Sequence, residues 1–414
     1  MVSIPSIAVL DRTLRDVTEF LAAELTAPSE KAPGWDDLHW RIALAAAVMQ
    51  GIAPLLAKQV RWHVPFWVQT LHEQRNHVTR RHVRIEALLK DIDERARRQD
   101  LVLVALKGSA LHALGVYEPG DRPMADIDLL VRRDDRTAAQ EVLRDCGFDL
   151  TFINSRHDLF EPRNRQAMSQ GYGEHFDNPL KVELHTSIRE RLPVDEIDIT
   201  DLLFPHAPQA GINGYRSTAA LMRHLLLHAA GNMRAHALRH IQLCDLARLS
   251  QLMGELDWSE LLDGGPGHQP LWWAAPPLIL TAKYFPRSIP DDVVRALEPH
   301  CTWLLRSRAQ RQNLSDVSWS NIRIYALPGV EWCKSLTDFF LFVRARILPD
   351  EEIRANLKHV DHEVKSSAVA WYGLSQNRRI LKWVFSRPPR VQTMSAVRTV
   401  LAMRIPPGRQ KSHD

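Results

Sequence analysis

The chain has 414 residues, of which 45% are hydrophobic and 25% charged, a composition typical of an ordinary soluble protein with two or three domains. Its four cysteines lie far apart without a C-x-x-C pair, which argues against a zinc knuckle or a disulfide framework and favours a reducing, cytoplasmic setting. The net charge of +4 is unevenly spread, since residues 301–414 hold 19 Lys and Arg against 9 Asp and Glu. This basic region is typical either of solvated helix faces or of contact with an anionic partner such as a membrane surface, nucleic acid or acidic peptide.

No targeting or membrane-spanning segment is predicted. The N-terminus reaches Asp11 without a basic region followed by a long apolar run, so we expect no secretory signal. The longest apolar run, residues 42–57, contains Gln50, Gly51 and Pro54 and falls short of the ~20 residues that a spanning helix needs.

Helices dominate the predicted structure of the first hundred residues. Apolar stripes at helical spacing predict helices over about 9–25, from Asp36 to about 50, and over 66–98, with a Pro- and Gly-containing loop at 27–34.

A strand, a turn, a short helix and a second strand follow between residues 101 and 131. The run LVLVAL is almost wholly apolar and predicts a buried strand, and Lys107-Gly108-Ser109 then predicts a tight turn. We expect a short helix over 110–115, a loop that carries Arg122, and a strand over 126–131.

The next segment repeats the alternation of helix and strand. A helix is predicted from about 134 to Gly147, a strand over 148–154, and a polar loop over 154–179. The chain then returns to LKVELHTSI, a predicted strand. Beyond about residue 205 the pattern is helical throughout, with later helices over 271–285, 291–312, 336–348 and 366–385.

Three carboxylates lie on predicted strands. Successive side chains of a strand point to opposite faces, so Asp126 and Asp128 share one face, and Glu183 shares a face with Lys181 and His185. Carboxylate oxygens suit Mg²⁺, which is also bound through substrate phosphates. A lone D-x-D is usually a solvated face, and it is the order of the flanking motifs that favours a metal site.

The motifs in this order resemble those of a known superfamily. Lys107-Gly108-Ser109, Arg122, Asp126-Ile127-Asp128 and Val182-Glu183-Leu184-His185 are similar to the minimal nucleotidyltransferase pattern of the DNA polymerase β superfamily, and most of all to an uncharacterised bacterial nucleotidyltransferase family. The resemblance covers about residues 100–190, and the flanking helices resemble that family more loosely. The loop between Gly108 and Asp126 is longer than in many superfamily members, but the closest family shares it.

The resemblance implies the roles of the site residues. Asp126, Asp128 and Glu183 would be the catalytic and metal-binding carboxylates, holding Mg²⁺ or Mn²⁺. Four residues would bind the phosphates of a nucleoside triphosphate, ATP above all: Lys107, Gly108, Ser109 and Arg122.

For several residues the sequence allows a structural interpretation as well as a functional one. Lys107 is either a phosphate contact or a solubilising charge at a strand end, and His185 either orients Glu183 or a substrate or packs at a sheet edge. The i, i+4 histidines 224/228 and 236/240 lack the glutamate of an H-E-x-x-H zinc motif, so we expect packing, capping or substrate contacts from them.

Together these patterns predict an α+β or α/β protein with a polymerase β-like core at residues 99–205, between helical regions at 1–98 and 206–414. The predicted activity is Mg²⁺-dependent transfer of a nucleoside monophosphate to a hydroxyl or similar group. A small-molecule or peptide acceptor is favoured over RNA, because no RNA-binding module is visible and the first 300 residues are net acidic. The alternatives are an inactive nucleotide- or partner-binding protein with the same fold, or a transferase of another phosphate-linked group.

Overall fold

The computed structural model describes residues 5–153, 157–164, 173–263, 270–319, 327–348, 377–378, 381, 397 and 399–402. The helix predicted over 366–385 therefore lies almost wholly outside the described residues.

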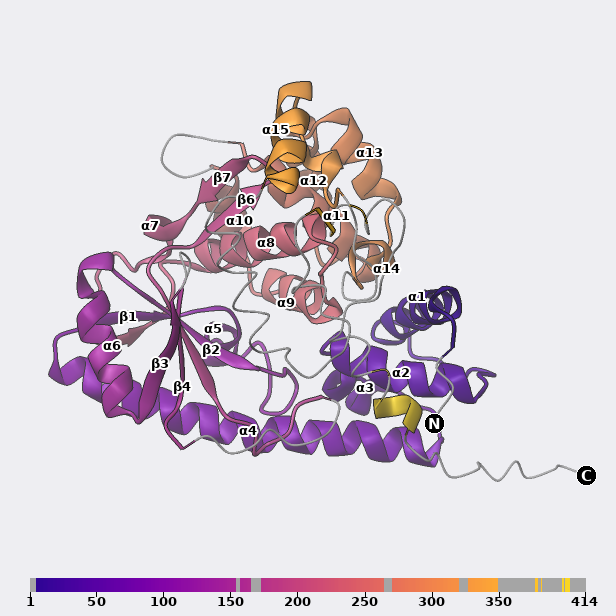
Figure 1. The fold of residues 1–414 in the computed structure, drawn as a ribbon, viewed down its shortest axis with the longest axis horizontal. Helices are drawn as coiled ribbons and strands as arrows, with labels where there is room; N and C mark the ends of the chain where they lie inside the picture. The colour runs from indigo at the N-terminus through magenta and orange to yellow at the C-terminus, as the bar shows by residue number, and fades with distance from the viewer. Residues whose placement is uncertain are drawn as a thin grey trace, which may run out of the picture.

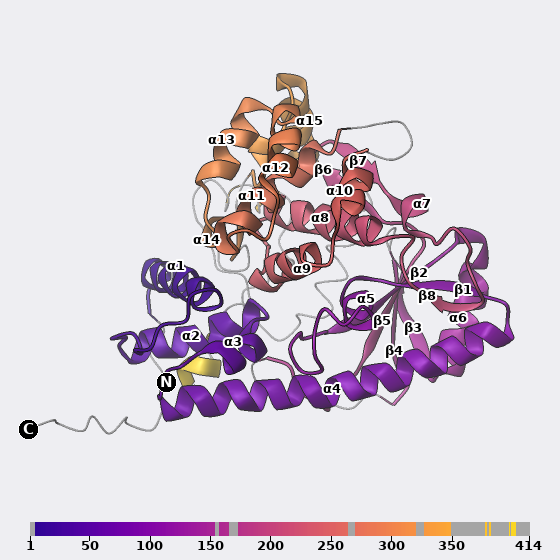
Figure 2. The ribbon, with the colours of Figure 1, turned by 180° about the vertical axis from the view of Figure 1, so that it is seen from behind.

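The chain begins with four helices, and the fourth is the longest element in the described residues. They are α1 (Ile7–Glu24), α2 (Asp37–Met49), α3 (Ala53–Gln59) and α4 (Pro65–Arg98). The bounds of α1, α2 and α4 agree with the predicted helices, and Asp36 caps α2 as expected. The short helix α3 was not predicted: it follows Gly51 and has Pro54 in its first turn. Figures 1 and 2 show α4 running beneath the molecule, with α2 and α3 over its first half and the sheet over its second half.

A six-stranded mixed sheet forms the centre of the protein, in the order β3-β4-β5-β2-β1-β8. Its strands are β1 (Val102–Ala105), β2 (Asp126–Val131), β3 (Phe148–Ile153), β4 (His157–Pro162), β5 (Lys181–His185) and β8 (Gly211–Asn213). The two central strands, β2 and β5, are parallel. Strands β6 (Arg189–Leu192) and β7 (Asp195–Asp198) form a separate hairpin, and the helices within this region are α5 (Lys107–Ala113), α6 (Arg136–Asp145) and α7 (Thr200–Leu203).

The two faces of the sheet have different surroundings. Residues of one face pack with α4 and α6 into a hydrophobic core that includes Ile85, Ile92, Ile127, Leu129, Val142, Leu143, Val182 and Leu184. On the opposite face Val104 and Leu130 join a larger core shared with the N-terminal and C-terminal helices. That second face carries the alternate side chains of β2 and β5, and it is the face toward α8 and α9 in Figure 1.

Helices form most of the remaining described chain. They are α8 (Thr218–Arg234), α9 (His240–Ser250), α10 (Glu255–Leu262), α11 (Ala275–Tyr284), α12 (Asp291–Leu297), α13 (Trp303–Arg311), α14 (Leu314–Val317) and α15 (Leu336–Ile347), and short 3-10 turns cover Arg133–Asp135, Trp272–Ala274, Glu298–His300 and Val330–Trp332. Within the described segments, no single helix has the length and apolar character to cross a membrane; α2 and α3 meet these criteria only as a pair bent by 112°.

Four predictions about secondary structure are wrong. The tight turn predicted at Lys107-Gly108-Ser109 is the first turn of α5, which begins at Lys107 and not at residue 110. The predicted polar loop contains β4, which the pattern hides because Asp158 is buried and paired with Arg136 and Gln140. The three-residue strand β8 lies beyond residue 205, and it exists only through its parallel pairing with β1. The helix predicted over 291–312 is divided into α12 and α13, because Pro299 interrupts it and Thr302 caps the second part.

Arg81 of α4 fastens the starts of the two central strands. Its guanidinium donates hydrogen bonds to the carbonyls of Met124 and Ala125 before β2, at 2.9 and 2.8 Å. It also donates to the carbonyls of Asn178 and Pro179 before β5, at 2.7 and 3.3 Å. The Arg81 side chain is only 3% exposed. Water therefore has little access to the four carbonyls and would not readily replace Arg81 as their hydrogen-bond donor. One buried cation therefore sets β2 and β5 side by side.

We predict that Arg81→Met lowers the unfolding free energy by about 3–5 kcal/mol, because the carbonyls it binds would be left without a donor. Thermal unfolding followed by circular dichroism measures the effect, which should be a fall of several degrees in the midpoint. Arg98→Met on the same helix is the control, since Arg98 is exposed and forms only a 3.9 Å ion pair with Glu94. Equal midpoints for the two variants would contradict the structural role of Arg81.

Candidate active site

The parallel pairing of β2 and β5 brings the three predicted carboxylates together. In this register Asp128 lies opposite Glu183, and Asp126 lies opposite Lys181. Ile127 and Val182 pack into the core with α4 and α6. Because side chains alternate along a strand, the acidic side chains point to the opposite face of the sheet, the one toward α8 and α9. The sequence pattern predicted that Asp126 and Asp128 share a face of one strand and that Glu183 and His185 share a face of another. The structure adds that both strands present these side chains on the same face of the sheet.

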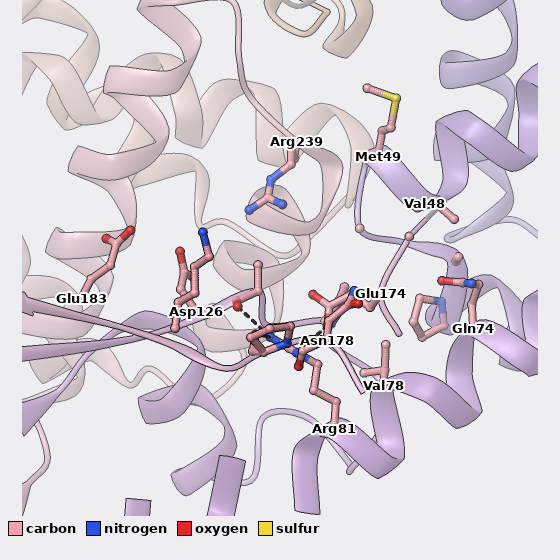
Figure 3. Close-up of a pocket in the computed structure, with 18 of the residues that line it drawn as sticks. Val48, Met49, Gln74, Val78, Arg81, Asp126, Glu174, Asn178, Glu183 and Arg239 are labelled. Carbon is pink, nitrogen blue, oxygen red and sulfur yellow. Dashed lines mark hydrogen bonds and ion pairs between the residues drawn. The ribbon is translucent and has the colours of Figure 1, made fainter. Parts of the chain in front are cut away.

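Two adjoining cavities open at this row of carboxylates. The smaller, about 390 Å³, contains all seven predicted catalytic and phosphate-binding residues in its wall: Lys107, Gly108, Ser109, Arg122, Asp126, Asp128 and Glu183. The larger, about 680 Å³, has Val48, Met49 and Val78 on its apolar side. Asp126, Glu174, Glu183 and Arg239 line both cavities. Figure 3 shows Arg239 reaching down toward Asp126 and Glu174, with the apolar residues at the far end.

Asp128 is the most strongly paired of the three carboxylates. Lys107 Nζ lies 2.9 Å from Asp128 Oδ1, and His185 Nε2 lies 3.0 Å from the same oxygen. Although burial opposes ionisation, these partners hold the pKa of Asp128 well below its usual range. Burial likewise opposes the protonated forms of Lys107 and His185, yet the neighbouring carboxylates raise the pKa of each. His185 thus contacts the acidic cluster and is not simply packed at the sheet edge.

Asp126 has the opposite electrostatic setting. Burial, together with repulsion from Asp128 and Glu183, raises the pKa of Asp126 to about 6. Three carboxylates at this spacing therefore carry more negative charge than Lys107 and His185 neutralise. A divalent cation would remove the repulsion, and the oxygen donors fit Mg²⁺.

The donor atoms are not all equally close. Across the described part of the chain, only His157, Glu183 and His185 bring three candidate ligand atoms within 4.8 Å of one another. The oxygens of Asp126, Asp128 and Glu183 do not form a group as tight as this one. The i, i+4 histidine pairs form no such group: His224 bonds Tyr215, and His236 bonds a backbone carbonyl.

The segment Lys107-Gly108-Ser109 forms the first turn of α5 and is held in place by contacts with Tyr215 and α8. Lys107 has a φ of +46°, and its backbone N–H donates to the Tyr215 hydroxyl at 3.1 Å. Tyr215 Oη in turn lies 2.7 Å from Nδ1 of His224 on α8. The left-handed backbone at Lys107 is uncommon for a residue with a side chain and is held by these contacts.

Arg122 lines the smaller cavity, but the Nε and Nη2 edge of its guanidinium is already bound to a carboxylate. Nε and Nη2 each lie 2.8 Å from a different oxygen of Asp245 on α9, and Tyr117 donates to the same carboxylate at 2.8 Å. The guanidinium also packs on Gly108, where a Cβ would lie 2.3 Å from Nη1, so any side chain there would displace it. Arg122 therefore ties the loop before β2 to α9 and does not present a free fork to a phosphate.

Sequence reasoning missed three residues of this site: His157 on β4, Glu174 before β5, and Arg239 at the start of α9. Burial, the largest influence, raises the pKa of Glu174 despite an ion pair of 3.0 Å with Arg81. Arg239 is exposed to the cavities, and its guanidinium makes no hydrogen bond or ion pair with the described residues. A basic residue before a helix and a histidine in a polar stretch carry no local signal, so only the fold reveals them.

One comparison with known proteins finds a family for most of this region. Residues 36–265, more than half of the chain, match a protein family described as "Uncharacterised nucleotidyltransferase". The matched range begins at α2 and ends after α10, so it includes the sheet, Arg81, Arg239 and Asp245. None of the curated proteins compared with the chain matches it.

The buried Arg122–Asp245 pair yields a stability prediction. We expect Arg122→Met to destabilise the protein by about 3–5 kcal/mol, because it leaves the 2%-exposed carboxylate of Asp245 uncompensated. The double variant Arg122→Met/Asp245→Leu should recover most of this loss, because it removes both charges. Chemical denaturation of the single and double variants measures the recovery. A double variant as unstable as the sum of the two single changes would show that the pair does not act as one unit.

Proposed function

The chain belongs to this nucleotidyltransferase family and is an enzyme of that class, and we propose that it transfers a nucleoside monophosphate from a nucleoside triphosphate to a hydroxyl group in a Mg²⁺-dependent reaction. ATP is the proposed donor, and the acceptor is a small molecule or a peptide or protein. We also propose that the mixed sheet with its flanking helices is a polymerase β-like core.

One observation carries the proposal: three carboxylates from two paired strands and the Lys107-Gly108-Ser109 turn surround a single cavity. The carboxylates suit divalent cations, and the same cavity contains the guanidinium of Arg239, which suits phosphate oxygens. Phosphoryl transfer needs mainly positioning and charge neutralisation, and this cavity offers both.

In the proposed reaction the acceptor oxygen bonds to the α-phosphorus of the triphosphate, and the bond from that phosphorus to the bridging oxygen breaks, so that pyrophosphate leaves. Asp126, Asp128 and Glu183 would hold two Mg²⁺ ions, which neutralise charge on the attacking and leaving oxygens. The acceptor proton would pass to a carboxylate at the cavity, and Glu183 lies at the junction with the larger cavity.

Arg239 is the proposed contact for the triphosphate. Lys107 is paired with Asp128 and Arg122 with Asp245, whereas the Arg239 guanidinium is open to both cavities. A guanidinium binds phosphate through parallel hydrogen bonds, and burial of its surroundings strengthens the attraction. α9 therefore adds a cation to a site whose acids come from the sheet.

The size and lining of the larger cavity favour a small molecule or an extended peptide as the acceptor. Its volume of about 680 Å³ is in the usual range for small-molecule sites. Its described walls combine apolar Val48, Met49 and Val78 with polar Gln74 and Asn178. Of the cations there, Arg81 is paired with Glu174 and Lys181 with Glu161, so the described residues offer no row of open cations that would follow a nucleic-acid backbone.

Removal of the D-x-D pair should abolish the activity. We predict that Asp126→Ala/Asp128→Ala lowers Mg²⁺-dependent pyrophosphate release at least ~10³-fold, because several kcal/mol of transition-state stabilisation depend on the ions they hold. The assay supplies each nucleoside triphosphate with a cell extract as the source of acceptor. Asp149→Asn is the control, since Asp149 lies on β3 of the same sheet but pairs with Arg163 at the surface. Equal pyrophosphate release by the native and double-variant proteins would refute the proposed mechanism.

A second prediction concerns Arg239. Arg239→Met should weaken binding of Mg²⁺·ATP about 10- to 100-fold, which corresponds to the loss of ~1.4–3 kcal/mol of charge-assisted hydrogen bonding, while the thermal midpoint stays near its native value. Calorimetric titration measures the affinity. Arg239→Lys should keep part of it, because the charge remains while the fork is lost. Native affinity in Arg239→Met would remove this residue from the phosphate site.

A further inference from the structure

A tighter group of ligand atoms lies at one end of the carboxylate row. His157 Nε2 is 3.7 Å from Glu183 Oε1, and His185 Nε2 is 3.5 Å from Glu183 Oε2. All three ligand atoms lie within 4.8 Å of one another. The backbone fixes this arrangement, because His157 lies opposite His185 in the antiparallel pairing of β4 and β5, and Glu183 is on the same face of β5.

These spacings suit one metal ion. In a tetrahedral site with bonds of about 2.0–2.1 Å, neighbouring ligand atoms are separated by about 3.3 Å, so each histidine is within a few tenths of an ångström of the required distance from one Glu183 oxygen. The two imidazole nitrogens, which lie within 4.8 Å of each other, would also have to approach one another around an ion.

The chemistry of the donors differs from that of the D-x-D pair. Two imidazoles and one carboxylate favour a late first-row cation such as Zn²⁺, Co²⁺ or Fe²⁺ over Mg²⁺, which prefers oxygen ligands and keeps much of its water. Asp126 and Asp128 offer only oxygens and lie on the next strand. The two ends of the acidic row therefore differ in the ions they select.

The group is also open to ligands. His157, Glu183 and His185 line a cavity of about 170 Å³ together with Ser187, Arg189 and His224. His157 and Glu183 face the larger cavity as well. Three protein ligands with access to a cavity leave a coordination position for water or a substrate oxygen, as catalytic zinc sites do.

We propose that His157, Glu183 and His185 form a binding site for a divalent transition-metal ion of the Zn²⁺ class, next to the Asp126–Asp128 position. Binding of the ion does not depend on the proposed function. Its role beside the reacting groups does rest on that function, since Glu183 belongs to both sets of ligands. The site would make this nucleotidyltransferase a mixed-metal enzyme, with Mg²⁺ on the phosphate side.

Co²⁺ titration of the full-length, metal-stripped protein without nucleotide tests the proposal. Co²⁺ bound by imidazoles at low coordination number absorbs visible light far more strongly than the hexahydrated ion, and Zn²⁺ should displace it and remove the absorption. We expect one Co²⁺ per chain, with the dissociation constant raised at least ~10-fold in His157→Gln and in His185→Gln. Asp126→Asn should keep the Co²⁺ absorption, because Asp126 is not a member of the group.

Controls separate this inference from general effects. His72→Gln removes an exposed imidazole from α4 and should bind Co²⁺ as the native protein does. Because His185 is buried, failure of its variant to fold leaves the test to His157→Gln, whose side chain is partly exposed. Native affinity and spectrum in His157→Gln would overturn the proposal and assign the histidines to orienting the carboxylates. Co²⁺ binding without any pyrophosphate release would support this site while contradicting the proposed function, and pyrophosphate release without Co²⁺ binding would do the reverse.

Discussion

The site depends on one buried cation that has no part in the chemistry proposed for it. Arg81 binds the carbonyls that precede β2 and those that precede β5, and so fixes where both strands begin. Because β-strand side chains alternate, a one-residue slip of either strand would move its carboxylates into the hydrophobic core. Arg81 and the apolar residues of the opposite face together exclude that slip. The long helix α4 is thus a support for the acids and not only a wall of the larger cavity.

The register fixed in this way places like charges side by side. Asp128 and Glu183 are directly opposed across the β2–β5 pairing, and like charges so placed are destabilising. The protein offsets part of the repulsion with Lys107 and His185, which contact Asp128, and leaves Asp126 with a raised pKa. Such uncompensated charge is rare in a structural core but is suited to a cavity that receives cations and phosphates. The electrostatic cost of the row is therefore an argument for its function.

Sequence alone predicted the parts of this site that depend on local periodicity. The alternation in DIDLLV and KVELH gave the faces of Asp126, Asp128 and Glu183, and the stripe on α4 gave the helix beneath them. It did not predict β4, since Asp158 interrupts the apolar pattern and is satisfied only by Arg136 and Gln140 of α6. Nor did it predict the partner of Arg122, because Asp245 lies 123 positions away. Contacts of that separation leave no trace in a single sequence, and the phosphate role assigned to Arg122 rested on the resemblance alone.

The helical region beyond the sheet is part of the site rather than an addition to it. α9 supplies Arg239 to the two cavities and Asp245 to the pair with Arg122, while α8 supplies His224, which holds Tyr215 against the Lys107 backbone. Movement of α9 relative to the sheet would therefore shift the Arg239 guanidinium and the loop before β2 together. Since the sheet provides the proposed metal ligands and Arg239 at the start of α9 is the proposed phosphate contact, the two proposed sites can form only when the sheet and α9 are packed together. The range matched by the family, residues 36–265, accordingly contains the sheet together with α8 and α9.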